Sequence, residues 1–181
     1  MVKIGINGFG RIGRLILRAL LENFKGKIQV AGINDLGSVE ANAHLIKYDS
    51  THGILNNDVK TTKEGFKIGD QNIKVFAERD PANLPWGKIG ADIVLECTGL
   101  FLNKETAGNH LKAGAKKVII SAPAKDVDFT IVQGVNSNKL NKEHNVISNG
   151  SCTTNCLAPV AMVLENNFGI EYGYMTTIHS Y

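Results

Sequence analysis

The sequence predicts an α/β protein built on a parallel, doubly wound sheet. Short apolar runs typical of buried strands alternate with segments of helical periodicity through most of the first 150 residues. The first run leads directly into a glycine-rich turn and then into a helical pattern. That order of strand, turn and helix is typical of a unit that binds a dinucleotide.

The opening strand is expected over Val2–Asn7, and the turn that follows reads G-x-G-x-x-G at Gly8, Gly10 and Gly13. Gly8 would allow the tight turn, Gly10 would let the backbone approach a pyrophosphate, and Gly13 would let helix and strand pack closely. The first N–H groups of the helix have no partner within it, and the helix dipole favours an anion there.

A second apolar run, Ile28–Ile33, ends in Asn34 and Asp35. Asp35 follows Gly13 by 22 residues, close to the roughly 20-residue spacing at which an acidic residue meets the ribose hydroxyls. An ordinary βαβ unit ending in a turn aspartate would show the same residues without a ligand. The glycine pattern in this context favours a dinucleotide site.

The remaining elements of the first 150 residues follow from periodicity and turn residues. A loop is expected at residues 48–53, a hairpin turning at residues 69–72, and a helix that Asn103 caps and Gly114 ends. Helices are expected over Val39–Ile46 and Lys104–Ala113, and strands over Phe66–Ile68, Ile73–Phe76, Asp92–Glu96, Lys117–Ser121, Phe129–Val132 and Asn145–Ser148.

Ligands of doubly wound sheets lie beyond the carboxyl ends of the strands. The residues just past apolar runs are therefore the candidates that line a cofactor: Gly8 to Ile12, Asn34, Asp35, Thr98, Gly99 and Ser121.

A change of composition at Ser148–Gly150 marks a domain boundary, with one domain over residues 1–150 and the start of a second over 151–181. A helical stripe follows, in which Pro159 is expected to bend or interrupt the helix. Residues 170–179 are expected to form a strand. We expect the second domain to be unfinished at Tyr181.

Cys152 lies at the predicted start of that helix, where the helix dipole stabilises a thiolate nucleophile. His179 is the candidate base, because a strand–helix–strand return would bring it to the same sheet edge. Cys156 is interpreted as a structural thiol and Cys97 as a core residue. Cys152, Cys156 and His179 could also hold a metal ion, but their spacing is not a usual zinc pattern, and no metal is predicted.

The other histidines have no predicted acidic partner and are interpreted as exposed or capping residues: His44, His52, His110 and His144.

Composition is that of a globular protein: 43% hydrophobic residues, 20% charged residues and a net charge of +3. The charge is too small, and the basic residues too scattered, to indicate a nucleic acid or a membrane as the main partner. Three cysteines and the absence of a signal-peptide pattern favour a reducing compartment, so cytoplasmic localisation is expected.

Over its whole length the chain resembles phosphorylating glyceraldehyde-3-phosphate dehydrogenases, and SCTTNC is the most specific segment. The matching segments are Gly5–Arg14, Asn34–Asp35, Tyr48–Gly53 (YDSTHG), Glu78–Pro81, Ser121–Pro123, Ser151–Pro159 (SCTTNCLAP) and Thr176–His179.

The resemblance implies a Rossmann-type NAD-binding domain followed by the start of an α+β catalytic domain. It implies that Cys152 is the nucleophile, that His179 activates it, and that Ser151 and Thr153 contact substrate or phosphate. The implied cofactor-binding residues are Asn7, Gly8, Gly10, Arg11, Ile12, Gly13, Asn34, Asp35, Arg79, Thr98, Gly99 and Ser121. Among these, the backbone of Arg11 and Ile12 would meet the pyrophosphate, Asp35 the adenosine ribose, Arg79 and Thr98 the adenine side, and Ser121 the nicotinamide end. From the residues alone, Arg79 could equally be a surface ion-pair residue.

The implied reaction is oxidation of glyceraldehyde 3-phosphate by NAD, with inorganic phosphate attacking a Cys152 thioester to give 1,3-bisphosphoglycerate. Because Asp35 is acidic and Leu36 is not basic, NAD is expected to be preferred over NADP. The resemblance also implies a homotetramer for a full-length chain, which would continue about as far again past Tyr181. We therefore expect residues 1–181 alone to bind NAD weakly, to expose an apolar face and to show little turnover.

Two alternatives stay open. One is the related erythrose-4-phosphate dehydrogenase, because the residues that distinguish the two dehydrogenases would lie largely past Tyr181. The other is a catalytically inactive nucleotide-binding module.

Overall fold

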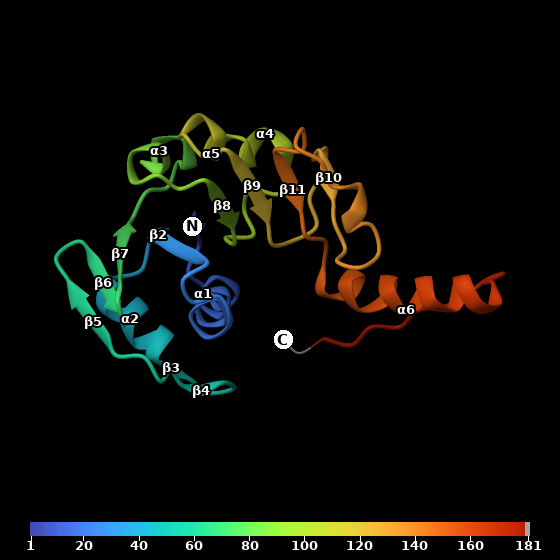
Figure 1. The fold of residues 1–181 in the computed structure, drawn as a ribbon, viewed down its shortest axis with the longest axis horizontal. Coiled ribbons are helices and arrows are strands. Elements are labelled where there is room, and N and C mark those ends of the chain that lie inside the picture. Colours follow the sequence, from blue (N-terminus) through green and yellow to red (C-terminus); the bar gives the residue numbers. More distant parts are fainter. Residues whose placement is uncertain (180–181) are drawn as a thin grey trace.

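The computed structural model describes residues 1–179 and is organised around one curved, nine-stranded sheet (Figure 1). Its strand order is β10-β11-β9-β8-β1-β2-β7-β6-β5, and β3 and β4 form a separate two-stranded hairpin. The strands are β1 (Val2–Asn7), β2 (Ile28–Asn34), β3 (Tyr48–Asp49), β4 (Gly53–Ile54), β5 (Val59–Thr62), β6 (Gly65–Ile68), β7 (Gln71–Phe76), β8 (Ile93–Glu96), β9 (Lys117–Ile120), β10 (Phe129–Thr130) and β11 (Val146–Ser148).

Helices lie on both faces of this sheet, except the last helix, which extends away from it (Figure 1). They are α1 (Arg11–Asn23), α2 (Val39–Lys47), α3 (Trp86–Ile89), α4 (Lys104–Ala107), α5 (Asn109–Lys112) and α6 (Cys152–Phe168), with 3₁₀ turns at Pro81–Asn83 and Ser137–Lys139. No helix within residues 1–179 has the length and apolar character needed to cross a lipid bilayer.

The doubly wound prediction is confirmed. Strand β1 pairs in parallel with β2 on one side and with β8 on the other, and the parallel pairing continues through β9, β11 and β10. On the other side β7 is parallel to β2, whereas the hairpin strands β6 and β5 are antiparallel. Because the order of connection reverses at β1, a crevice opens above its carboxyl end.

Alternation along β1 separates two cores. Ile4 and Ile6 are buried in the core that includes Leu17 of α1 and Ile46 of α2. Gly5 faces the opposite side, where a Cβ would lie 2.6 Å from the ring of the buried Trp86. Side chains of successive strand residues point to opposite faces, so Asn7 shares the Trp86 side of the sheet.

A buried cation joins the two helices of the first core. Arg18 on α1 is 5% exposed, and its guanidinium donates to the carbonyls of Ile46, Lys47 and Gly53. It thereby satisfies carbonyls that the C-terminus of α2 leaves free.

The predicted helix over Lys104–Ala113 is present as two short segments, α4 and α5, separated by Gly108. Glycine is the least favourable residue other than proline in a helix interior, which explains the break. The cap is as expected, since the Asn103 carboxamide oxygen accepts from the Thr106 N–H at 2.8 Å. The predicted loop over residues 48–53 contains the two-residue strands β3 and β4.

Two expectations about the last thirty residues are wrong. Helix α6 runs through Pro159 without interruption; no residue of α6 is buried, so water can bond the carbonyl that Pro159 leaves free. Residues 170–179 form no strand, because a strand needs a neighbouring backbone and no described strand pairs with them. In Figure 1 this segment runs back along α6 as an irregular trace.

Candidate functional site

The structure places a cavity of about 370 Å³ at the carboxyl ends of β1, β2, β7 and β8. It lies at the point where the strand order reverses, as expected for a ligand of a doubly wound sheet. Seven of the predicted cofactor residues line it: Asn7, Gly8, Gly10, Asn34, Asp35, Arg79 and Thr98. Leu36, Glu78, Cys97, Leu100 and Phe101 complete the lining.

Two of the three glycines of the β1–α1 turn are required by close approach of neighbouring backbone. Gly8 has φ +89°, and a Cβ there would lie 2.7 Å from the Thr98 nitrogen. A Cβ at Gly13 would collide with the Gly8 carbonyl oxygen, whereas one at Gly10 would meet nothing within 4 Å. Gly8 and Gly13 thus serve the close packing of the turn, and Gly10 leaves its outer surface open.

The N-terminus of α1 is suited to an anion. Among residues 1–179 no side chain caps this helix, and no acidic residue lies in its first turn. The first-turn N–H groups, which include those of Arg11 and Ile12, therefore have room for a phosphate oxygen. The donors and the cradle fit a dinucleotide pyrophosphate.

The Arg11 side chain points elsewhere. Its guanidinium pairs with Asp49 and lies 3.2 Å from the Nδ1 atom of His52. The backbone N–H groups of His52 and Thr51, together with this guanidinium, hold the pKa of Asp49 well below its ordinary value. Arg11 therefore fixes the loop that contains β3 and β4 to the start of α1.

Asp35 shapes the pocket as well as lining it. Its Oδ2 atom accepts from the Phe9 N–H at 2.8 Å, and Oδ1 accepts from the Gly37 N–H at 2.8 Å. Each carboxylate oxygen can accept two hydrogen bonds, so Asp35 keeps acceptor capacity for ribose hydroxyls. It joins the glycine turn to the end of β2 and offers the charge that a 2′-phosphate would meet.

A buried polar network lies beneath the pocket, and sequence reasoning missed most of it. Glu96 and His110 are fully buried, and His110 Nε2 lies 2.9 Å from Glu96 Oε2. The interpretation of His110 as an exposed residue without an acidic partner is therefore wrong. The same carboxylate accepts from Asn7 Nδ2 at 2.6 Å and from the Thr98 N–H at 2.8 Å. Asn7 and Thr98 line the pocket, so the network supports it from below.

Five predicted cofactor residues do not line this cavity: Arg11, Ile12, Gly13, Gly99 and Ser121. Ile12 is exposed on the first turn of α1, and Gly99 has φ +75° in the loop after β8. Ser121 follows β9, and its hydroxyl bonds the half-buried Cys97. Burial raises the pKa of the Cys97 thiol to about 11, which makes Cys97 a poor nucleophile at neutral pH.

The cysteine helix begins at the same sheet edge. Cys152 is the first residue of α6 and is exposed. Ser151 is the N-cap, and its hydroxyl accepts from the Thr154 N–H at 2.9 Å. His179 Nε2 lies 3.4 Å from the Thr153 hydroxyl and 2.9 Å from the Thr177 hydroxyl. The return of the chain thus brings His179 beside the first turn of α6 although the expected strand is absent.

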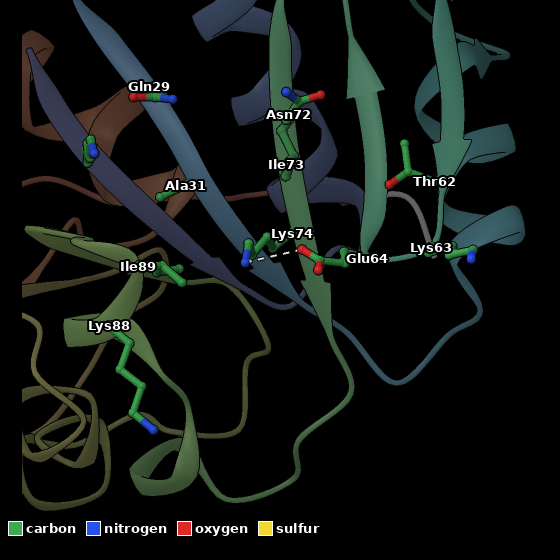
Figure 2. Close-up of a pocket in the computed structure, with 11 residues that line it drawn as sticks. Gln29, Ala31, Thr62, Lys63, Glu64, Asn72, Ile73, Lys74, Lys88 and Ile89 are labelled. Atoms are coloured by element: carbon green, nitrogen blue, oxygen red, sulfur yellow. Dashed lines mark ion pairs between the residues drawn. The ribbon is translucent and has the colours of Figure 1, made fainter.

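The described residues hold no cluster of three metal-ligating side chains. A larger hollow of about 600 Å³ lies on an open sheet face below α3 and is bordered by Lys3, Lys63, Lys74 and Lys88. Figure 2 shows that Lys63 and Lys88 point away from its centre, and Lys74 pairs with Glu64 at 3.2 Å. This hollow contains none of the predicted site residues.

Comparison with known proteins agrees with the resemblance seen in the sequence. Residues 2–104 match the family description "Glyceraldehyde 3-phosphate dehydrogenase, NAD binding domain", and residues 151–181 match the corresponding C-terminal domain.

Curated relatives named glyceraldehyde-3-phosphate dehydrogenase share more than half of their aligned residues with this chain. The protein of Geobacillus stearothermophilus is 58% identical over 181 residues, which is 99% of this chain and 53% of the relative. That of Xanthobacter flavus is 56% identical over 180 residues, 99% of this chain and 54% of the relative. The chain spans about half the length of the curated relatives it matches. It belongs to the glyceraldehyde-3-phosphate dehydrogenase family, and it contains that family's NAD-binding domain.

Proposed function

We propose that this chain carries the cofactor site and the nucleophile of an NAD-dependent dehydrogenase that converts glyceraldehyde 3-phosphate and inorganic phosphate into 1,3-bisphosphoglycerate. The observation that carries the proposal is the order of candidate residues along one sheet edge. Asp35, Gly8, Thr98, Ser121 and Ser151 follow the adjacent strands β2, β1, β8, β9 and β11.

This order matches an extended dinucleotide that lies across the strand ends. Four strand spacings of about 4.8 Å separate β2 from β11, about 19 Å in all. The adenosine ribose would lie at Asp35, the pyrophosphate at the first turn of α1, and the nicotinamide beyond Thr98 toward Ser121. Gly99 and Arg79 would border this path. The nicotinamide end would then point toward Cys152.

The chemistry expected of the chain's own residues begins with the Cys152 thiolate, which adds to the aldehyde carbon to give a thiohemiacetal. His179 accepts the thiol proton before this addition, returns it to the former aldehyde oxygen as the thiohemiacetal forms, and accepts the hydroxyl proton as the hydride leaves. Ser151 and Thr153, on either side of the thiol, would contact the substrate or the attacking phosphate. Bound NAD supplies the hydride acceptor. Inorganic phosphate then attacks the Cys152 thioester and releases the thiolate.

We also propose residues 1–150 as the cofactor domain and residues 151–181 as the start of the catalytic domain. In support, the sheet ends at Ser148 and the next element, α6, begins at Cys152. A cytoplasmic location and a homotetrameric full-length enzyme are proposed from the family.

The test measures NADH formation by the chain with glyceraldehyde 3-phosphate, NAD and inorganic phosphate. Cys152→Ser is compared with Cys156→Ser, its matched control one helical turn further on. We expect any turnover to disappear in Cys152→Ser and to persist in Cys156→Ser, and to be greater with the triose than with erythrose 4-phosphate.

A second readout does not need turnover. Iodoacetamide alkylation of Cys152 is followed by mass spectrometry, and glyceraldehyde 3-phosphate should slow it while leaving Cys156 unaffected. Equal behaviour of the two cysteines in both assays would contradict the assignment of the nucleophile.

A further inference from the structure

The buried network beneath the pocket contains a carboxylate with no cation beside it. Glu96 is 1% exposed and His110 is 0% exposed, and no lysine or arginine among the described residues forms an ion pair with Glu96. Burial of an unpaired charge is expensive unless hydrogen bonds compensate it. The positions of the protons in this network therefore decide what it can do, and the geometry assigns each of them.

The assignment begins at a backbone group whose role is known. The Glu78 N–H donates to Asn34 Oδ1 at 2.8 Å, which fixes the orientation of the Asn34 amide. Asn34 Nδ2 therefore donates to Asn7 Oδ1 at 2.7 Å. Asn7 Nδ2 must then face Glu96 Oε2, at 2.6 Å, as a donor.

The other end of the network is set by an indole, which can only donate. Trp86 Nε1 lies 2.9 Å from His110 Nδ1, so Nδ1 is an acceptor and the proton of the neutral ring is on Nε2. That proton points to Glu96 Oε2. The Thr98 hydroxyl accepts from the Leu100 N–H at 3.1 Å, and it donates to Glu96 Oε1 together with the Thr98 N–H.

Four donors therefore converge on Glu96, and none of them can become an acceptor without breaking another contact. Asn7 Nδ2 and His110 Nε2 lie only 3.4 Å apart because both donate to the same oxygen. A carboxylate has about four acceptor sites, all of which are used here. The network admits one arrangement of protons only.

We propose that Glu96 and His110 are positioning residues of the cofactor pocket. They fix the directions of the Asn7 amide and the Thr98 hydroxyl, and through Asn7 that of Asn34, before any ligand binds. All three of these residues line the pocket. The proposal rests on the proposed cofactor site, and it assigns Glu96 and His110 no contact with the cofactor.

The test uses Glu96→Gln, which keeps the shape of the side chain but replaces one acceptor by an NH₂ group. If its oxygen accepts from Thr98, the new amide nitrogen takes the place of Oε2 and faces the donors of both Asn7 and His110. His110 could relieve this by moving its proton to Nδ1, but the Trp86 N–H blocks that position. Trp86→Phe removes the block, so it should partly rescue Glu96→Gln.

ADP-ribose affinity is measured by calorimetry for the unchanged chain, both single variants and the double variant. Glu105→Gln, an exposed carboxylate on α4, is the matched control. We expect Glu96→Gln to weaken ADP-ribose binding roughly tenfold, because the Asn7 amide and the Thr98 hydroxyl lose their fixed directions. Glu105→Gln should have no effect. Adding Trp86→Phe to Glu96→Gln should restore part of the affinity, although Trp86→Phe alone should lower it.

Imidazole ¹⁵N chemical shifts of the unchanged chain give a readout that no folding defect in a variant can obscure. In the unchanged chain they should show a neutral His110 with its proton on Nε2. The same measurement on the double variant should show the proton on Nδ1. A proton on Nδ1 in the unchanged chain would overturn the proposal. An unaltered ADP-ribose affinity in Glu96→Gln would do the same, as would a loss of affinity from Trp86→Phe that is equal in the unchanged chain and in Glu96→Gln. Failure of the unchanged chain to bind ADP-ribose would overturn the proposed cofactor site and this role with it.

Discussion

Gly13 packs directly against Gly8, so that a Cβ at Gly13 would collide with the Gly8 carbonyl oxygen. Gly10, between them, has only open space around it. The three glycines of one motif therefore do different things, and substitutions can separate packing from ligand approach.

Gly13→Ala should lower the free energy of unfolding by about 2 kcal/mol, because the new methyl group must displace backbone. Gly10→Ala should change it by less than about 0.5 kcal/mol, since φ −68° and ψ −159° are open to alanine. Gly10→Ala should nevertheless weaken ADP-ribose binding about tenfold, which corresponds to about 1.4 kcal/mol, by occupying the space where a pyrophosphate would lie. Urea unfolding and calorimetry check both variants. Unchanged affinity in Gly10→Ala would contradict the assignment of this turn as the phosphate cradle.

Asp35→Asn should relax discrimination against a 2′-phosphate. The Asp35 carboxylate lines the pocket, and no basic residue follows it at Leu36. Removing its charge should lower the ratio of the NADP dissociation constant to the NAD dissociation constant about tenfold, mainly because NADP binds more tightly. Asp70→Asn, in the exposed hairpin turn, is the charge-matched control. An unaltered ratio in Asp35→Asn would place the ribose elsewhere.

The three cysteines should differ in their rates of alkylation. Burial raises the pKa of Cys97 to about 11, so at pH 8 its thiolate fraction is about a hundredfold below that of an ordinary thiol. Cys152 and Cys156 are exposed. Peptide mapping after iodoacetamide treatment should show Cys97 reacting last in the folded chain and as fast as the others in urea. Rapid labelling of Cys97 in the folded chain would contradict its described environment.

Asp128 should make stability depend on pH in the acid range. Burial alone would raise its pKa, but hydrogen bonds from Lys104 and from the backbone N–H groups of Val146 and Asn145 lower the pKa of Asp128 to about 2. Because the folded pKa lies below the unfolded value of about 4, its stabilising effect is present above about pH 4 and is lost as pH falls toward 2.

The Asp128→Asn variant should therefore be less stable by about 1 kcal/mol at pH 7 and nearly unchanged at pH 2. Chemical unfolding across this range measures the difference. Asp126→Asn, an exposed neighbour with no ion pair in the described chain, should follow the unchanged chain at every pH. If Asp128→Asn lowered the free energy of unfolding by the same amount at every pH, the charge of Asp128 would contribute nothing to stability.

The sheet and the glycine turn could be predicted because their signals are local. The first 35 residues contain all of them: the apolar run of β1, the spacing of Gly8, Gly10 and Gly13, and the distance from Gly13 to Asp35. The buried network could not be predicted in this way. Asn7 and Glu96 are 89 residues apart, and His110 meets Glu96 only because α5 packs against β9, the strand next to β8.

Arg18 shows the same limit, because the helical pattern of α1 gives no sign that this cation is buried against the end of α2. The expected strand over residues 170–179 fails for the opposite reason. Its alternation is local, but a strand exists only where another backbone supplies hydrogen bonds. Short-range sequence patterns thus predict individual helices and strands well. They predict poorly the contacts and the strand pairing that need a residue far along the chain.

Helix α6 is seventeen residues long, yet none of its residues is buried, and Phe168 is 83% exposed. Little holds it apart from its own backbone and the Ser151 cap, so it should open without disturbing the sheet. Amide hydrogen exchange should then show two regimes: rapid exchange along α6 and slow exchange in β1, β2 and β8. The segment that carries Cys152, the proposed nucleophile, would then unfold as a cooperative unit separate from the sheet that forms the proposed cofactor pocket.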